Sequence, residues 1–308
     1  MIIQLLEPEG FPPPALERLA SIGHVVIGTQ TDTSRVNAVF VRLASRLDAA
    51  FHARYPELQW IVSPTTGLNH IDVGYFEAAG VRILSLRGRT EFLDRIRATT
   101  EHTVALTLAL LRNLPAAAKA VLDGKWDRYP HKGRELCGKT VLIYGYGRIG
   151  RQIAPIYQAF GCRVLAHDIV PDRVPADLRC DLGVALPEVD ICSIHLPLTS
   201  ETEGLIGEAV LGRLPAQAVV VNTSRGEIID QNYLLEALEA GRLAGAALDV
   251  LVDEPDPLTP TLRARLAALG DRILVTPHIA GFTHESLATV ETYIADVFID
   301  ALHAPETA

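Results

Sequence analysis

The stretch that decides the fold is VLIYGYGRIGRQIA, residues 141–154, in which an apolar run ends in a glycine turn. Gly145, Gly147 and Gly150 have the spacing G-x-G-x-x-G. The first glycine allows a tight turn, the second lets the backbone approach a pyrophosphate, and the third lets helix and strand pack closely. The following helix would offer free N–H groups and the positive end of its dipole to the phosphates. The stretch therefore predicts a strand, a turn and a helix that together bind a dinucleotide.

Asp168 narrows the choice of dinucleotide. It ends the next apolar run, RVLAHD at 163–168. A carboxylate at this place hydrogen-bonds both ribose hydroxyls of NAD and repels the additional phosphate of NADP. The alternative is an ordinary glycine turn with a capping aspartate, which the combination of strand, spacing and acidic residue disfavours. We therefore expect NAD as the cofactor. Pro155 lies inside the expected helix, where a proline removes one hydrogen bond and tends to cause a kink.

Apolar runs on both sides of the glycine turn predict two series of parallel strands. Short strands that alternate with helical patterns form βαβ units, so we expect an α/β protein with two doubly wound parallel-sheet domains. The longest helical pattern covers 98–124 and should end or kink near Pro115, and a last helix should cover about 284–301. Ligands of such folds bind outside the carboxyl ends of the strands. The expected strands lie within 2–8, 24–28, 38–43, 58–64 and 81–86, and then within 139–147, 163–168, 190–197, 218–224, 243–250 and 272–278.

Composition and charge exclude several classes of protein. The 308 residues are 48% hydrophobic and 21% charged, as is usual for a globular protein. The net charge of −9 argues against nucleic acid as a partner, because phosphate-backbone binding needs a basic face. The N-terminus has no basic segment typical of a signal peptide, and no apolar run is long enough for a membrane span. No zinc-ligand spacing occurs, so we expect no metal site and a cytoplasmic protein with reduced, mostly buried thiols at Cys137, Cys162, Cys180 and Cys192.

Three motifs each place an ionisable residue where a strand should end. They are NTSRGEIID (222–230), ALDVLVDEPDP (247–257) and TPHIAGFTHES (276–286), with Arg225, Glu254 and His278. Arginine binds a carboxylate and polarises a carbonyl, histidine delivers a proton, and a carboxylate orients the imidazole. Singly, these residues could be a turn arginine, a solvated glutamate and a core histidine. Together, beyond a dinucleotide turn, they predict hydride transfer to a 2-keto acid.

In this order and spacing, GYGRIG, NTSRG, ALDV with DEP, and TPHIAG resemble the motifs of the NAD-dependent D-isomer-specific 2-hydroxyacid dehydrogenases. The resemblance extends over nearly the whole chain and implies an Arg/Glu/His triad at Arg225, Glu254 and His278. It also implies a flavodoxin-like substrate domain, 1–99 with 283–308, into which a Rossmann-type NAD-binding domain, 100–282, is inserted. Members are typically homodimers joined mainly through the cofactor domain. The cofactor contacts implied are Gly145, Tyr146, Gly147, Arg148, Ile149, Gly150, Asp168, His195, Leu196, Pro197, Thr202, Thr223, Ser224, Arg225, Asp249, His278 and Gly281.

The stretch SPTTGLNHID, 63–72, is similar to the substrate loop of this family. The backbone N–H groups of Thr66, Gly67 and Leu68 would then hold the substrate carboxylate. Two departures from the family pattern stand out. Glu227 replaces a glycine that is common after the arginine, and LRGRTEFLDRIR (86–97) replaces the usual short link before the interdomain helix. These departures concern the identity of the substrate rather than the type of reaction.

The arginines of the replaced link suggest a second anionic group on the substrate. Arg87 and Arg89 follow a strand end, and the planar guanidinium suits phosphate or phosphonate. The stretch VFVRLASR, which contains Arg42, supports the same interpretation. It resembles a stretch of phosphoglycerate dehydrogenases in which the arginine approaches the substrate phosphate. The alternative is a loop held by weak surface ion pairs with Glu91 and Asp94.

We therefore expect a D-2-hydroxyacid dehydrogenase for a substrate resembling 3-phosphoglycerate or phosphohydroxypyruvate, with a simple acid such as glyoxylate or hydroxypyruvate as the alternative. Formate dehydrogenases of this scaffold carry glutamine in place of Glu254, which counts against formate, whereas phosphite oxidation stays open. An NAD-sensing corepressor is a third reading, disfavoured by the short tail HAPETA. With so few residues after Gly281, a regulatory domain for serine feedback is not expected.

Overall fold

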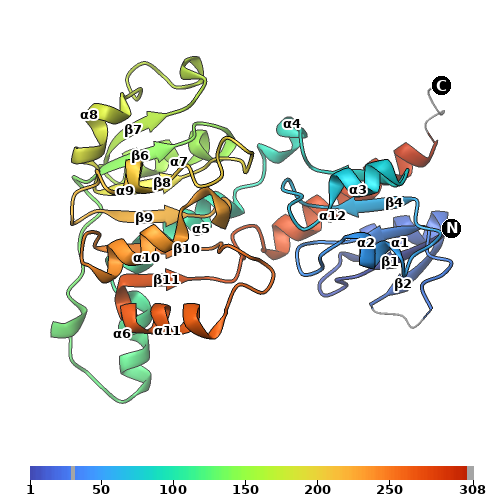
Figure 1. Cartoon of the computed structure of the whole chain (residues 1–308), viewed down its shortest axis with the longest axis horizontal. Coiled ribbons are helices and arrows are strands. Elements are labelled where there is room, and N and C mark those ends of the chain that lie inside the picture. The colour runs from blue at the N-terminus through green and yellow to red at the C-terminus, as the bar shows by residue number, and fades with distance from the viewer. Residues whose placement is uncertain (29–31, 304–308) are drawn as a thin grey trace. The chain divides into compact units, whose positions relative to one another are not determined.

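The computed structural model describes residues 1–28 and 32–303. The chain forms two compact units, Met1–Ile96 with Phe282–Ala308, and Arg97–Gly281. We call them unit 1 and unit 2. The chain therefore passes between the units twice, at Ile96–Arg97 and at Gly281–Phe282. The sequence-based boundaries, after residues 99 and 282, lie within three residues of these positions. Each unit is built on its own parallel sheet (Figure 1).

Unit 1 is built on a five-stranded parallel sheet with the order β2-β1-β3-β4-β5. This is the order of flavodoxin-like doubly wound sheets. Successive residues of β3 face opposite sides, so that Phe40 packs in one apolar cluster with Phe298 and Val39 packs in another with Phe76. The strands are β1 Ile2–Leu5, β2 His24–Ile27, β3 Ala38–Phe40, β4 Trp60–Ser63 and β5 Arg82–Ser85, and the helices are α1 Pro13–Ile22, α2 Ala49–His52, α3 Val73–Ala78, α4 Thr90–Leu93 and α12 His284–His303.

Unit 2 is built on a six-stranded parallel sheet with the order β11-β10-β9-β8-β6-β7. The strand order reverses between β6 and β8, which is the point where doubly wound sheets bind dinucleotides. The strands are β6 Thr140–Tyr144, β7 Arg163–His167, β8 Ile191–Ile194, β9 Val219–Asn222, β10 Gly245–Leu248 and β11 Ile273–Val275. Two parallel sheets with interleaved helices confirm the expected α/β class, and every expected strand is present.

The helices of unit 2 cover both faces of its sheet. The long helical pattern breaks at Asn113, which has a φ of 51°, and α5 and α6 are bent by 65° there. Pro115 lies in the first turn of α6, where its missing N–H costs nothing. Pro155, which was expected to kink the helix after the glycine turn, lies inside α7, and this helix continues to Ala159. The helices are α5 Ala98–Leu111, α6 Leu114–Leu122, α7 Arg148–Ala159, α8 Leu182–Ala185, α9 Glu208–Leu211, α10 Gln231–Glu239 and α11 Pro260–Leu269.

The cysteines are all free, but fewer are buried than expected. Cys162 and Cys192 are buried, Cys180 is partly buried and Cys137 is exposed. Within the described ranges, no group of His, Cys, Asp and Glu is arranged to hold a metal ion. A search of the same ranges finds no single helix that is long and apolar enough to span a membrane, although α5 and α6 as a bent pair meet the length and composition criteria.

Candidate active site

The glycine turn after β6 has the shape that a dinucleotide needs. Gly145 has a φ of +100°, and a Cβ there would lie 2.5 Å from the carbonyl oxygen of His195. A Cβ on Gly150 would lie 2.2 Å from the carbonyl oxygen of Gly145. By contrast, the space around Gly147 is open to 4 Å, and Gly147 caps α7 without a side-chain hydrogen bond. The turn thus leaves the N-terminus of α7 accessible for a pyrophosphate, and the residues present fit an NAD molecule.

Asp168 is fixed beside this turn. Its Oδ2 accepts a hydrogen bond from the N–H of Tyr146 at 2.9 Å, and its Oδ1 accepts one from the N–H of Val170 at 2.9 Å. Arg173 approaches the same carboxylate at 3.7 Å. The carboxylate is buried and held at the end of β7, where the ribose of a bound NAD lies in this kind of fold.

The loop after β8 carries further expected cofactor contacts. Nε2 of His195 lies 2.8 Å from Oγ of Ser193, and burial lowers the pKa of His195 to about 3, so its imidazole is neutral at ordinary pH. Thr202 folds the loop back, because its hydroxyl donates to the carbonyl oxygen of Pro197 at 2.6 Å. Leu196 approaches the position of a Cβ on Gly145 at 3.0 Å. These residues border the glycine turn on the β8 side.

Arg225 is held by the loop that follows β9. Asn222 organises this loop, since its Nδ2 donates to the carbonyl oxygen of Arg225 at 2.8 Å and its Oδ1 accepts from the hydroxyl of Ser224 at 2.6 Å. Gly226 is required next, because a Cβ there would lie 2.1 Å from the carbonyl carbon of Leu251. Burial lowers the pKa of Arg225, and nearby carboxylates oppose this shift. An arginine nevertheless stays protonated in proteins, so the loop presents a partly desolvated cation.

His278 and Glu254 form a side-chain pair through Nδ1 of His278 and Oε2 of Glu254. The other carboxylate oxygen, Oε1, accepts the N–H of Leu251 at 2.9 Å, which fixes the orientation of the carboxylate. Glu254 also lies close enough to Arg225 to act on its pKa. The strands β9, β10 and β11 are neighbours in the sheet, so their carboxyl ends bring these three residues together. The pairing leaves Nε2 of His278 as the nitrogen for proton transfer.

Asp249 holds the backbone around His278. It is completely buried, and its carboxylate accepts the N–H groups of Ile279 at 2.9 Å and Ala280 at 2.8 Å. Its own carbonyl oxygen accepts the N–H of His278 at 2.8 Å. This clamp maintains a φ of 53° at His278, in the left-handed region that costs free energy for a residue with a Cβ. Burial would raise the pKa of Asp249, but the hydrogen bonds from His102, from Thr276 and from the two N–H groups lower it.

Thr223 and Gly281 complete the expected cofactor contacts. The hydroxyl of Thr223 lies 2.8 Å from that of Thr103 on α5, and Gly281 is exposed at the end of unit 2. The expected set missed His102 and Thr103, which bond to the loops that carry the catalytic candidates. Only the polar residues in ATTEHT, at the start of an otherwise apolar helix, could have indicated them.

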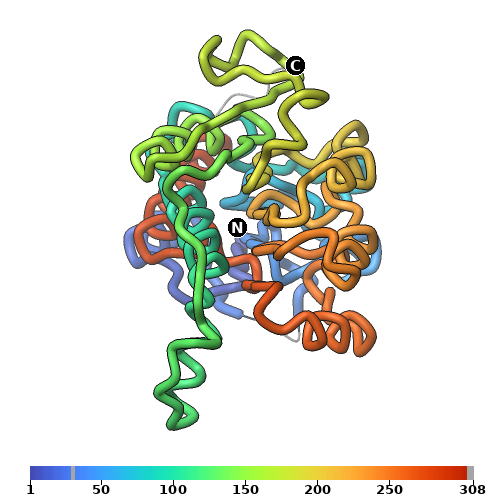
Figure 2. The backbone as a smooth tube through the Cα atoms, turned by 90° about the vertical axis from the view of Figure 1, so that its left-hand side faces the viewer, coloured from blue at the N-terminus to red at the C-terminus, as the bar shows by residue number. Residues whose placement is uncertain are grey.

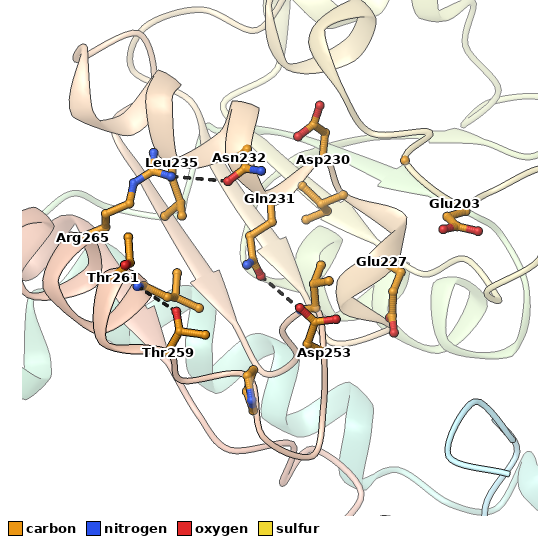
Figure 3. Close-up of a pocket in the computed structure, with 15 residues that line it drawn as sticks. Glu203, Glu227, Asp230, Gln231, Asn232, Leu235, Asp253, Thr259, Thr261 and Arg265 are labelled. Carbon is orange, nitrogen blue, oxygen red and sulfur yellow. Dashed lines mark hydrogen bonds between the residues drawn. The ribbon is translucent and has the colours of Figure 1, made fainter. Parts of the chain in front are cut away.

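A pocket of about 490 Å³ lies beside the candidate site in unit 2. Its walls come from α10, α11 and the loops after β8, β9 and β10. Four acidic side chains line it, and Figure 3 shows Arg265 at the opposite end from Glu203 and Glu227. In the sequence, Glu227 lies two residues after Arg225, and Asp253 directly precedes Glu254. Arg225, Glu254 and His278 themselves do not line the pocket. The carboxylates of this pocket are Glu203, Glu227, Asp230 and Asp253.

In unit 1, the expected substrate loop follows β4. Its shape is set by Thr65, whose hydroxyl donates to the carbonyl oxygen of Gly67 at 2.8 Å. Within residues 1–28 and 32–303, the N–H groups of Thr66, Gly67 and Leu68 have no hydrogen-bond acceptor. Adjacent N–H groups without an internal acceptor form an environment that suits an anion.

The three arginines expected at the substrate differ in their surroundings. Arg87 and Arg89 are exposed, and their side chains make no ion pair within the described part of the chain, including with Glu91. Arg42 instead is buried in unit 1. Its Nε lies 2.5 Å from Oε1 of Glu291, and its Nη1 donates to the carbonyl oxygen of Glu9 at 2.8 Å. Arg42 therefore has a structural partner that the sequence did not indicate.

Comparison with known proteins identifies the family. Residues 104–280 match the model of the D-isomer specific 2-hydroxyacid dehydrogenase, NAD binding domain. A D-3-phosphoglycerate dehydrogenase of Archaeoglobus fulgidus is 33% identical over 274 residues, which are 87% of this chain and 50% of that protein. A hydroxypyruvate reductase of Thermotoga maritima is 32% identical over 254 residues, which are 82% of this chain and 80% of that protein.

A solved structure agrees with the sequence matches. The D-lactate dehydrogenase of Aquifex aeolicus, complexed with NAD and lactic acid, has a TM-score of 0.80 and 25% identity, and the alignment covers 98% of this chain and 96% of that one. The chain spans about half the length of the phosphoglycerate dehydrogenase that it matches. The family match supports NAD as the cofactor, as the glycine turn and Asp168 had predicted. From its strand order, its glycine turn and these matches, the chain belongs to the D-isomer specific 2-hydroxyacid dehydrogenase family.

Proposed function

We propose that the protein is an NAD-dependent oxidoreductase that interconverts a D-2-hydroxyacid and the corresponding 2-keto acid. The observation that carries this proposal is the pair formed by His278 and Glu254, next to Arg225, at the ends of three neighbouring strands. These groups lie on the same carboxyl edge of the sheet as the dinucleotide turn, where ligands of doubly wound sheets bind. Bound NADH supplies the hydride for the reduction.

Each side chain of the triad has one task in this reaction. The guanidinium of Arg225 binds the substrate carboxylate and polarises the keto group. Nε2 of His278 donates a proton to the keto oxygen, and the carboxylate of Glu254 on Nδ1 stabilises the imidazolium from which that proton comes. In the direction of oxidation, the neutral imidazole accepts the hydroxyl proton at the same nitrogen. The N–H groups of Thr66, Gly67 and Leu68 contribute further donors for the carboxylate.

For the substrate, we propose a 2-keto acid with a second anionic group, such as a phosphate or phosphonate. Arg87 and Arg89 support this, because both are exposed and neither guanidinium is neutralised by an acidic neighbour in the described ranges. The alternative that they form surface ion pairs with Glu91 finds no support among the ion pairs of residues 1–28 and 32–303.

A simple 2-keto acid, such as glyoxylate or hydroxypyruvate, is the second candidate. The observation that favours it is the ion pair between Arg42 and Glu291. An arginine that is 9% exposed and already paired has fewer donors to offer a phosphate. The D-lactate dehydrogenase and hydroxypyruvate reductase among the similar proteins act, by name, on acids without a phosphate.

NADH oxidation against a panel of 2-keto acids tests both proposals. Half of the panel carries a phosphate or phosphonate group, and the other half consists of matched acids without it. With a dianionic substrate, the double variant Arg87→Ala/Arg89→Ala loses kcat/KM by about 10- to 100-fold for each charged contact, and only on the dianionic half. If the wild type and the variant have equal kcat/KM on every phosphorylated acid, the proposal that Arg87 and Arg89 bind a second anionic group of the substrate is contradicted. If no keto acid of the panel is reduced, the proposed oxidoreductase activity is contradicted.

We also propose that the protein is a homodimer, and that the arm formed by residues 114–131 takes part in the contact. The arm leaves the body of unit 2 (green in Figure 2), and α6 has no buried residue. Apolar side chains on it are exposed, among them Leu122 at 87%, Trp126 at 93% and Tyr129 at 79%. Exposed apolar clusters of this kind mark protein interfaces. Sedimentation of Trp126→Glu should show a monomer where the wild type is a dimer, and a monomeric wild type would refute the proposal.

A further inference from the structure

The first turns of α5 bond to α7 and to two loops at the carboxyl edge of the unit 2 sheet. The hydroxyl of Thr100 donates to Gln152 on α7 at 2.7 Å, and the hydroxyl of Thr103 lies 2.8 Å from that of Thr223 before the catalytic arginine. His102 reaches the loop before His278. These contacts join residues that are distant in sequence, and they begin directly after the chain has entered unit 2 at Arg97.

His102 faces two oxygen atoms. Its Nε2 lies 3.1 Å from Oγ1 of Thr276 and 3.3 Å from Oδ1 of Asp249. The hydroxyl of Thr276 uses its only proton in a 2.5 Å hydrogen bond to the same Oδ1. Both oxygens therefore act as acceptors towards the imidazole, so Nε2 of His102 carries a proton and donates it.

The carboxylate that receives these hydrogen bonds is the one that shapes the backbone at His278. Asp249 is completely buried, and its oxygens accept the N–H groups of Ile279 and Ala280. A buried carboxylate that loses a donor either shifts its position or takes up a proton. Either change loosens the clamp that keeps His278 in its left-handed conformation. The link from His102 to the backbone at His278 therefore runs through Asp249.

We propose that His102 is a positioning residue for catalysis, which acts through Asp249 to fix the backbone of His278. This proposal rests on the proposed function. The network also joins the two places where the chain passes between the units, since His102 follows Arg97 and Ile279 and Ala280 precede Gly281. Both connecting segments are thereby attached to one carboxylate at the catalytic edge of the sheet.

The test compares three variants of the full-length protein. His102→Phe keeps the ring and removes the donor, whereas His102→Gln keeps an N–H that can reach Asp249. Thr100→Val is the matched control, because it removes a buried hydrogen bond from the same turn of α5 without touching Asp249. The expected result for His102→Phe is a loss of kcat of about 10- to 100-fold, as for a small displacement of a catalytic group, with little change in KM for NADH. His102→Gln should recover most of this loss, and Thr100→Val should retain kcat.

Amide hydrogen exchange of Ile279 and Ala280 provides a readout that needs no substrate. In His102→Phe, both amides should exchange about tenfold faster than in the wild type, whereas Thr100→Val should leave them unchanged. Thr276→Val removes the other side-chain donor to Asp249, and it should shift exchange in the same direction if His102→Phe does not fold. Unchanged exchange and kcat in His102→Phe would overturn the proposal. A wild type without turnover contradicts only the proposed function, because exchange still reports on the network.

Discussion

Replacement of Glu254 by glutamine tests the proton-transfer pair at the centre of the proposed reaction. In the structure, both oxygens of Glu254 act as acceptors. Oε2 contacts Nδ1 of His278, and Oε1 accepts the N–H of Leu251 at 2.9 Å. A glutamine has one acceptor oxygen and one donor amide in the same place. Glu254→Gln can therefore satisfy only one of these two donors.

Both orientations of the glutamine are unfavourable. If its oxygen stays on Leu251, its NH₂ group points at Nδ1, and the imidazole can no longer carry a proton on that nitrogen. The protonated imidazole that donates to the keto oxygen is then disfavoured. If its oxygen turns to His278 instead, the NH₂ group meets the N–H of Leu251, and this partly buried donor is left without a partner. The loss of a general acid or of its orienting carboxylate costs about 10²- to 10⁴-fold in rate.

The assay is NADH oxidation at several pH values with the best 2-keto acid of the panel. We expect kcat to fall by about 10²- to 10⁴-fold while the dissociation constant for NADH, measured by fluorescence, stays near that of the wild type. Glu254→Asp is the control that keeps the charge and shortens the side chain. A Glu254→Gln variant with the kcat of the wild type would show that the carboxylate does not support the proton donor, and the assignment of His278 would fail with it.

Three further changes have definite outcomes. Gly226→Ala puts a Cβ 2.1 Å from the backbone carbonyl carbon of Leu251, so thermal melting should show a loss of about 1–3 kcal/mol and kcat/KM should fall. Asp168→Ala should lower the preference for NADH over NADPH in kcat/KM by about 10- to 100-fold, and an unchanged preference would contradict the role of Asp168. The pKa of Asp249 is lowered from 3.8 on folding, so its contribution to stability is complete above that pH and is lost as the pH falls through the folded value. Urea unfolding should therefore show that Asp249→Asn differs from the wild type by a constant free energy near neutral pH, and that this difference shrinks in acid.

Much of the fold follows from local features of the sequence. Each strand of the two sheets coincides with a short apolar run, because a parallel strand covered on both faces needs apolar residues along its length. The residues at the glycine turn, and Asp168 after the next strand, are also defined by their spacing, since the turn and the helix N-terminus are built from consecutive residues. The bend expected near Pro115 occurs two residues earlier, at Asn113, because a proline in the first turn of a helix is compatible with that helix.

The site itself was only partly accessible from the sequence. Arg225, Glu254 and His278 could be selected because each follows a strand, and neighbouring parallel strands place their carboxyl ends together. The pairing of Glu254 with Nδ1 of the His278 imidazole depends on how the loop after β10 turns back towards β11. Glu291, the partner of Arg42, lies 249 positions along the chain, on the last helix. Thr276, a partner of His102, lies 174 positions along the chain, in the loop that carries His278.

The sequence by itself therefore determined the elements, the dinucleotide turn and the residue types at the strand ends, because these depend on periodicity and on neighbours along the chain. Only the tertiary structure decided which buried charges are paired. Arg42 bonds to Glu291, and Asp249 accepts the N–H groups of Ile279 and Ala280 in the loop that carries His278, whereas the sequence indicated neither of these partners. A charge that is removed from water needs a partner, and the partner is whichever group the order of the strands and the packing of the helices bring to it.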